Sequence, residues 1–280
     1  MIEFTHNIED YPDGIILPVD KPYRWTSADV IRKVKYAAIR HFGTKNLKVG
    51  HAGTLDPLAT GILLVCIGPA TRKAEELQRS PKQYLAGVTF GATTPSYDLE
   101  KDIDREFPLD GVNETSIKNL LPSFTGRQEQ IAPLFSAKSV DGVRAYEMAR
   151  KLYREARMTG CGFRHEDAEL LSRQVIEIYG MELESFDSEG VVSASCKGMA
   201  SDGKCRINVA DISRYRLPTA MIRVDCSKGT YIRALARDLG EALGSGAFLS
   251  SLRRTGNGGF GIADALTLDE VLAALGPAEQ

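Results

Sequence analysis

The spacing of apolar residues predicts a helix near the start of the chain. Between Val30 and Ile39, apolar side chains recur every three or four positions, which is the period of one helix face. The preceding segment Thr26–Asp29 has the pattern of a capping box, and Gly43 supplies a C-terminal stop. The run from Ile62 to Ile67 is instead unbroken, apolar and rich in β-branched residues, which predicts a strand buried on both faces.

The other apolar runs predict strands and helices that do not alternate strictly along the chain. Further strands are expected at 14–20, 84–91, 175–186, 191–196 and 221–226. Helices are expected at 71–78, 116–121, 142–153 and 230–243, and a last short helix begins at the capping pattern 267–270. The polar run 91–102 predicts a loop, and 155–168 and 186–218 predict surface insertions. Such a mixture is typical of an α+β domain around a mixed sheet.

The composition limits the size of the core and the cellular setting. With 280 residues, 43% of them hydrophobic, the chain can bury one large core, or one core and a small appendage. No apolar run approaches the roughly 20 residues that a membrane span requires, and the N-terminus lacks a secretory signal. The five cysteines show no C-x-x-C spacing, which argues against a zinc site and for free thiols. We therefore expect a cytoplasmic protein.

The net charge of −2 conceals an uneven distribution of charged residues. Between residues 21 and 48 the only acid is Asp29, and the bases are Lys21, Arg24, Arg32, Lys33, Lys35, Arg40, Lys45 and Lys48. One basic face on a nearly neutral protein suits a polyanionic substrate. Charge alone is equally compatible with an ordinary solvated helix face.

The segment from Gly50 to Gly68, GHAGTLDPLATGILLVCIG, presents one carboxylate between a turn-forming run and the predicted buried strand. Pro57 disfavours helical backbone for the residue before it, which predicts that Asp56 is extended or in a turn. An acid held on a glycine-rich loop at the edge of a buried strand suits a nucleophile or a general base. On this segment alone, an Asx-turn or helix-cap aspartate remains the more common interpretation.

Two further segments carry residues that suit the same chemistry. Cys226 to Arg233 runs from a strand through a glycine turn into a helix, which predicts that Tyr231 and Arg233 lie near its positive N-terminal end. An arginine there can pair with a buried carboxylate and hold it ionised. Tyr84 opens a predicted strand, where its ring could stack on a flat base. Taken singly, a helix-surface arginine and a core tyrosine are the more ordinary explanations.

Five segments of the chain together carry a resemblance to a known family. They are GIILPVDKPYRWTS (14–27), VGHAGTLDPLATGILLVCIGPATR (49–72), KQYLAGVTFGATTPSYD (82–98), SAKSVDGVRAYEMAR (136–150) and CSKGTYIRALARDLGEALGSGAFLSSLRRT (226–255). In this order and spacing they resemble the TruB family of tRNA pseudouridine-55 synthases. The resemblance covers most of residues 14–255 and implies the pseudouridine synthase fold, an α+β fold with a mixed, mainly antiparallel β-sheet and flanking helices.

The resemblance implies that Asp56 is the catalytic aspartate, that Tyr84 packs against the target base, and that Arg233 pairs with Asp56. Conversion of uridine to pseudouridine breaks the C1′–N1 bond and joins C5 to C1′ without a redox change, so a carboxylate nucleophile suffices and no cofactor is expected. The sequence shows no nucleotide-binding glycine motif and no metal-ligand spacing, so no metal is expected. The sequence leaves open whether Asp56 attacks C1′ of the sugar, attacks C6 of the base or removes a sugar proton.

The same resemblance assigns four residues to substrate binding, namely Lys21, His51, Arg72 and Tyr231. By the family pattern, His51 supports the flipped-out substrate loop, Tyr231 shapes the pocket, and Lys21 braces the active-site loop. Arg72 stands where lysine is usual, which keeps the charge but not the geometry. The expected partner is the T-stem-loop of tRNA, and neither a membrane nor a protein partner is implied.

The resemblance also predicts the domain organisation, with a catalytic domain over residues 1–265 and a short C-terminal helix and tail over 266–280. About 25 residues follow Thr255, too few for the RNA-binding PUA domain that many relatives carry. Two alternative functions remain open, namely the same isomerisation on another structured RNA, and a non-catalytic chaperone that refolds tRNA. A glycosidase is disfavoured because no second acid accompanies Asp56 in the matching segments.

Overall fold

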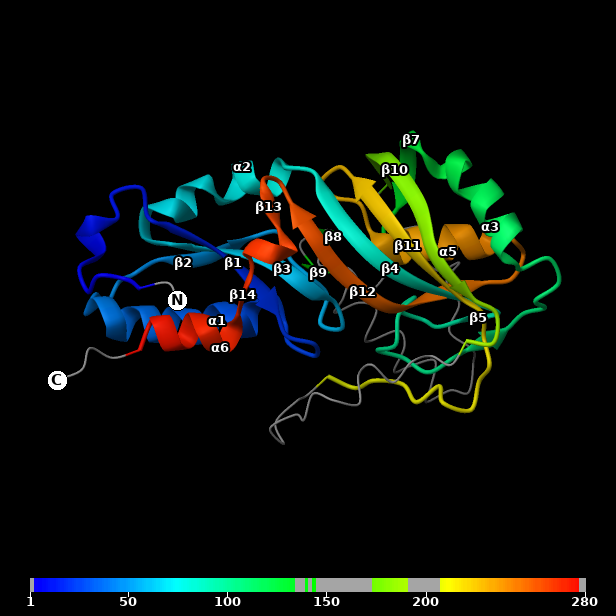
Figure 1. The fold of residues 1–280 in the computed structure, drawn as a ribbon, viewed down its shortest axis with the longest axis horizontal. Coiled ribbons are helices and arrows are strands. Elements are labelled where there is room, and N and C mark those ends of the chain that lie inside the picture. The colour runs from blue at the N-terminus through cyan, green and yellow to red at the C-terminus, as the bar shows by residue number, and fades with distance from the viewer. Residues whose placement is uncertain (1–2, 134–138, 141–142, 145–172, 191–206, 277–280) are drawn as a thin grey trace. The chain divides into compact units, whose positions relative to one another are not determined.

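The computed structural model describes residues 3–133, 139–140, 143–144, 173–190 and 207–276 (Figure 1). The chain divides into two compact units. Unit 1 comprises Met1–Tyr84, Gly198–Ile207 and Leu252–Gln280, and unit 2 comprises Leu85–Lys197 and Asn208–Ser251. Strands β4 (Lys82–Phe90) and β12 (Ala247–Asn257) contribute residues to both units.

Strand β3 (Thr60–Ile67) is the centre of the sheet in unit 1. It pairs antiparallel with β1 (Ile15–Lys21) and β2 (Val49–Ala52), and parallel with β12. The short strands β14 (Leu266–Thr267) and β13 (Phe260–Gly261) pair with β1 and β12, respectively. All of β3 after its first residue is buried, as the unbroken apolar run predicts.

Helix α1 (Ser27–Phe42) begins and ends at the predicted residues. The Thr26 hydroxyl accepts a hydrogen bond from the Asp29 backbone N–H at 3.1 Å, and the Asp29 carboxylate accepts one from the Thr26 N–H at 3.1 Å. Gly43 follows in the left-handed conformation (φ 63°) that a helix C-terminus favours. The capping box and the glycine stop are thus confirmed.

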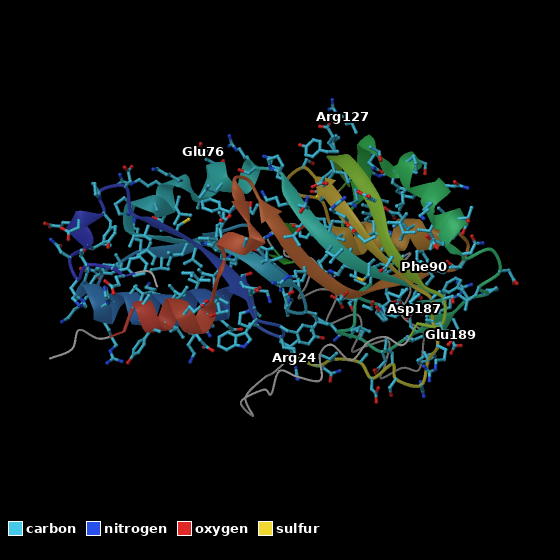
Figure 2. All side chains as sticks on the ribbon, in the orientation of Figure 1. Arg24, Glu76, Phe90, Arg127, Asp187 and Glu189 are labelled. Atoms are coloured by element: carbon cyan, nitrogen blue, oxygen red, sulfur yellow. The ribbon has the colours of Figure 1, made fainter. Side chains whose placement is uncertain are left out.

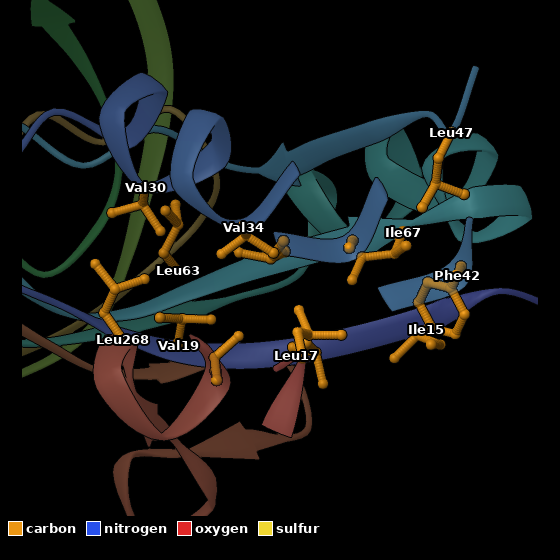
Figure 3. Packing of buried hydrophobic residues seen from close by; sticks show 14 residues of the cluster. Ile15, Leu17, Val19, Val30, Val34, Phe42, Leu47, Leu63, Ile67 and Leu268 are labelled. Carbon is orange, nitrogen blue, oxygen red and sulfur yellow. The ribbon is translucent and has the colours of Figure 1, made fainter. Parts of the chain in front are cut away.

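The core of unit 1 lies between this sheet and two helices, α1 and α6 (Leu268–Ala274) (Figure 3). Val30 and Val34 of α1 belong to the same buried cluster as Val19 of β1 and Leu63 of β3. The apolar stripe that predicts the helix is therefore the stripe that it buries. The opposite side of α1 carries exposed bases, which are Arg32, Lys33, Lys35 and Arg40.

Unit 2 contains an antiparallel sheet in which β10 (Arg173–Asp187) pairs with β11 (Thr219–Cys226) and with β7 (Gly126–Ile131). Every second residue of β11 is buried, which is typical of a strand with one face on the core. Helix α5 (Ile232–Ala242) is largely buried, and α3 (Glu114–Leu120) lies beside β10.

The remaining elements are short. They are α2 (Ala74–Arg79), β5 (Ala92–Thr93), β6 (Arg105–Glu106), β8 (Ser139–Val140), β9 (Val143–Arg144), and the 3-10 helices η1 (Ile8–Asp10), η2 (Gly68–Lys73), η3 (Leu121–Phe124) and η5 (Ile262–Asp264). Charged side chains such as Glu76 of α2 and Arg127 of β7 are exposed and project outward (Figure 2). No helix in the described part of the chain is long and apolar enough to span a membrane.

One predicted helix is wrong where the structure describes it, and the loop expected at 91–102 contains the short strand β5. The helix expected at 142–153 begins in a segment where Val143 and Arg144 instead form β9, paired with β8. The dipeptide at 141–142 is Asp-Gly, a strong signal for a two-residue hairpin, and it outweighs the helical spacing that follows. The rest of this helix, the strand expected at 191–196, the insertion at 155–168 and most of that at 186–218 lie outside the described residues. The domain boundary at 265 stays a prediction.

Candidate active site

Asp56 lies in a tight turn between β2 and β3 of unit 1. The backbone N–H of Ala59 donates to the Asp56 carbonyl oxygen at 3.1 Å, which closes a β-turn with Pro57 in its second position. This confirms the prediction of a non-helical backbone for Asp56. The side chain is half-buried, and the turn places it directly before the buried strand β3.

Side chains from two other elements hold the backbone around Asp56. The Ser27 hydroxyl at the start of α1 accepts a hydrogen bond from the Leu55 N–H at 3.0 Å and donates to the Leu55 carbonyl at 3.2 Å. The Lys21 ammonium at the end of β1 donates to the Pro57 carbonyl at 3.2 Å. The residues on both sides of Asp56 are therefore fixed by side chains far away in the sequence.

Lys21 is fully buried, and its ammonium also donates to the Pro22 and Trp25 carbonyls at 2.9 and 2.6 Å. Burial lowers the pKa of Lys21 from 10.5 to about 7, against the opposing attraction of Asp56. The charge of Arg254 on β12 lowers it further. The predicted bracing role of Lys21 agrees with these contacts, and its place among substrate-binding residues stays a prediction.

His51 lies on β2, opposite Val65 of β3, and is half-buried. Burial and the nearby charge of Arg254 both lower its pKa, so its imidazole is neutral at physiological pH. Its Nδ1 atom is buried and has no hydrogen-bond partner among the residues that the structure describes. A buried polar atom of this kind is uncommon and suits a site that a substrate completes.

Arg233 lies in unit 2 as the second residue of α5, with a side chain only 5% exposed. Its guanidinium donates to the Ser96 carbonyl at 3.1 Å, and its Nε lies 3.8 Å from the Asp98 carboxylate. Asp98 is itself buried and accepts from the Ser96 hydroxyl at 2.6 Å and from the Glu100 N–H at 2.9 Å. The arginine is thus held in place by a buried acid of its own unit.

Tyr231 occupies the N-cap position of α5. The Gln130 side chain of β7 binds its backbone twice, because its amide donates to the Tyr231 carbonyl at 3.1 Å and its carbonyl accepts from the Tyr231 N–H at 2.8 Å. This clamp fixes the start of the helix that carries Arg233. The prediction that Tyr231 and Arg233 lie at the N-terminal end of a helix is confirmed.

The other two predicted residues lie in unit 1. Tyr84 is buried in β4, with 9% of its surface exposed, and Arg72 is exposed on η2. Asp56 and Lys21 are neighbours within unit 1. Asp56 belongs to unit 1 and Arg233 to unit 2, so their pairing stays a prediction. The stacking role of Tyr84 and the binding role of Arg72 also stay predictions.

Two family models match the chain. A model described as TruB family pseudouridylate synthase (N terminal domain) matches residues 40–192, and one described as tRNA pseudouridylate synthase B C-terminal domain matches residues 233–280. The chain belongs to the TruB family.

Relatives within the TruB family match almost the whole chain. The tRNA pseudouridine synthase B of Phocaeicola vulgatus is 42% identical over 93% of this chain and 92% of its own length. That of Bacteroides thetaiotaomicron is 43% identical over 92% of this chain and 91% of its own length. The structure of a Cbf5-Nop10-Gar1 complex matches 95% of this chain and 56% of the other chain, with 24% identity and a TM-score of 0.59. The predicted family and the predicted α+β fold are both confirmed.

Three residues that fix the segments around Asp56 and Arg233 were not identified from the sequence. Asp98 and Arg254 lie within segments that resemble the family, and Ser27 lies in the capping pattern of α1. No strand is predicted over 247–257, so the opposite facing of the two consecutive arginines becomes apparent only once β12 is known. Among the described residues, no group of three or more His, Cys, Asp or Glu side chains could hold a metal ion.

Proposed function

We propose that this TruB-family protein isomerises uridine 55 in the T-loop of tRNA to pseudouridine, with Asp56 as its nucleophile. Family membership makes the chain a pseudouridine synthase that acts on tRNA. The single observation that carries the assignment of Asp56 is its turn, whose flanking residues are held by the buried side chains of Lys21 and Ser27. A carboxylate in a fixed backbone can be aimed at one atom of a substrate.

The reaction needs only such a group and a place for one proton. The C1′–N1 bond breaks, the uracil turns over, C5 joins C1′, and the proton lost from C5 is balanced by the one gained at N1. Asp56 supports this sequence as a covalent nucleophile, which divides one difficult step into two easier ones. The neutral imidazole of His51 is suited to contact the extruded nucleoside, because a flipped base must replace the contacts that it loses in its stack.

Arg233 serves, in this proposal, to keep the Asp56 carboxylate ionised when substrate excludes water. A carboxylate in a dry pocket protonates unless a cation lies beside it. The contacts of Arg233 within unit 2 support this role, because Asp98 and the Ser96 carbonyl fix the guanidinium before substrate arrives. Tyr84 would offer its ring to the target base, a stacking contact worth roughly 1–3 kcal/mol.

The exposed bases of α1 would bind the phosphates of the T-stem. Lys33, Lys35 and Arg40 are exposed, and the Arg40 guanidinium lies over the ring of Tyr36, which is 67% exposed. Phosphate contacts orient an RNA without reading its sequence. Recognition of position 55 would then depend on the shape of the loop that this surface presents to Asp56.

The test is Asp56→Asn, assayed on a tRNA transcript that carries 5-tritiated uridine. We expect the variant to release no tritium and to bind tRNA with an affinity within about threefold of the parent, since the amide keeps the shape of the side chain but cannot act as a nucleophile. Asp20→Asn is the matched control, because Asp20, like Asp56, raises the pKa of Lys21 but belongs to no proposed chemical step. Substantial turnover by Asp56→Asn would refute the assignment. A parent protein that converts uridines other than 55 would refute the T-loop specificity.

A further inference from the structure

Two consecutive arginines of β12 point to opposite sides of the strand. The Arg253 side chain is 40% exposed and pairs with Asp20 at 2.7 Å. Arg254 is only 1% exposed, and it is among the largest fully buried side chains of the described chain. The interior arginine therefore needs a separate explanation from its neighbour.

Within the described part of the chain, every hydrogen bond of the Arg254 guanidinium goes to a backbone carbonyl of the segment that contains Asp56. Its Nε donates to the Ile62 carbonyl at 2.6 Å, and its Nη2 donates to the Gly53 carbonyl at 3.1 Å. A longer contact of 3.5 Å joins Nη1 to the Thr54 carbonyl. One planar group thus ties the strand after Asp56 to the loop before it.

The position of this guanidinium is set by the backbone of β12. Arg254 pairs with Gly61 of β3, and an added Cβ on Gly61 would lie 2.2 Å from the Arg254 carbonyl oxygen. Only glycine permits so close an approach, and Gly61 also has φ +96°. The arginine is therefore anchored to the start of β3 by backbone as well as by side chain.

A buried cation held by carbonyls alone is a costly way to stabilise a loop. Removing a guanidinium from water is costly even beside an ionic partner, and the hydrogen-bond partners of Arg254 are all neutral. A buried apolar residue would contribute more to folding. The contacts of Arg254 therefore point to a role in the function of the loop.

We propose that Arg254 is a positioning residue, which fixes the Gly53–Ile62 segment so that Asp56 is held at the geometry required for attack on the nucleoside. This inference rests on the proposed role of Asp56. Arg254 does not touch the reacting atoms and acts through the backbone that carries them.

The charge of Arg254 gives this role a second consequence that can be measured without RNA. It lowers the pKa of His51 and that of Lys21, while Asp56, Asp20 and Asp29 raise the pKa of Lys21. Loss of the guanidinium should therefore raise the pKa of His51. The chain has four histidines, so an NMR titration with His51→Gln as the assignment variant can follow this ring.

The experiment compares Arg254→Met and Arg254→Lys with two controls. Arg253→Met removes the same charge from the preceding residue, whose guanidinium binds Asp20 and the Thr60 hydroxyl instead of the loop carbonyls, and its rate should stay within about threefold of the parent. Val271→Ala weakens the core of unit 1. We expect Arg254→Met to lower the single-turnover rate of pseudouridine formation about 100-fold, the usual effect of an ångström-scale displacement, with little change in tRNA affinity. Arg254→Lys keeps the charge but cannot span the carbonyls, so its rate should fall while the His51 pKa stays near that of the parent.

Three results would overturn the proposal. The first is a single-turnover rate for Arg254→Met within about threefold of the parent, the second is an equal loss in Val271→Ala, and the third is a rate for Arg254→Lys equal to that of the parent. If Arg254→Met does not fold, Arg254→Lys decides by the same rate measurement. If the parent protein forms no pseudouridine, the proposed function fails. The His51 titration still tests whether the charge of Arg254 lowers the pKa of His51.

Discussion

Burial of Lys21 predicts that the protein becomes more stable as the pH rises above neutrality. The ammonium is fully buried among three carbonyls, and its pKa falls from 10.5 to about 7. At about 1.4 kcal/mol per pH unit, this difference corresponds to about 5 kcal/mol that the charged form costs the folded state below pH 7. Between the two pKa values the unfolded chain binds the proton and the folded chain does not. The free energy of unfolding therefore increases across this window.

The assay is urea unfolding of the parent and of Lys21→Met at pH 7.5 and at pH 9.5. Relative to the variant, the parent should gain about 2 to 3 kcal/mol over these two pH units. The lost hydrogen bonds of Lys21→Met add an offset that is the same at both pH values, and the other titrating groups are present in both proteins. Parallel stability profiles for the two proteins would refute the reasoning, because they would mean that folded Lys21 keeps its proton.

Two other predictions concern packing and RNA binding. Gly61→Ala should lower the free energy of unfolding by at least about 3 kcal/mol, because the added Cβ would overlap the backbone of β12 and the residue has a positive φ. Gly43→Ala, at φ +63° with open space around it, should cost only about 1 kcal/mol. Urea unfolding of both variants measures the difference. Equal costs would contradict the predicted overlap. Lys33→Glu on α1 should weaken tRNA binding and reduce the slope of log affinity against log salt by about 1, whereas Lys118→Glu on α3 should change neither, as filter binding at several salt concentrations would show. An unchanged slope for Lys33→Glu would remove α1 from the RNA surface.

The features that could be predicted from sequence depend on neighbouring residues. Pro57 restricts the backbone of Asp56, and Thr26 caps α1 through a residue three positions on. The contact of Arg254 with the Gly53 carbonyl joins residues 201 positions apart, and no local pattern encodes it. The helix expected at 142–153 fails at β9 for a related reason, since a strong turn signal there competes with helical spacing.

The difference between local and long-range contacts also explains why Asp98 could not be recognised as a partner of Arg233. Both residues lie within segments that resemble the TruB family, but 135 residues separate them in the sequence. Buried acids are rare unless they are paired, so burial, once known, identifies Asp98 at once. From sequence alone, the Ser-Tyr-Asp run at 96–98 reads as an ordinary loop, and the loop conformation is indeed what brings the carboxylate onto α5.

The loop that carries Asp56 is fixed by side chains whose burial lowers the stability of the folded state. Surface loops usually leave their carbonyls to water, which keeps them mobile. Here the carbonyls of Gly53, Leu55 and Pro57 are bound by side chains of β12, α1 and β1, and two of these three side chains are buried basic groups. A buried basic group weakens the folded state when it is charged, so a fold selected for stability alone would fill these positions with apolar residues. Their presence around one turn, and the orientation of their donors toward its backbone, are best explained by a need to hold the Asp56 carboxylate still.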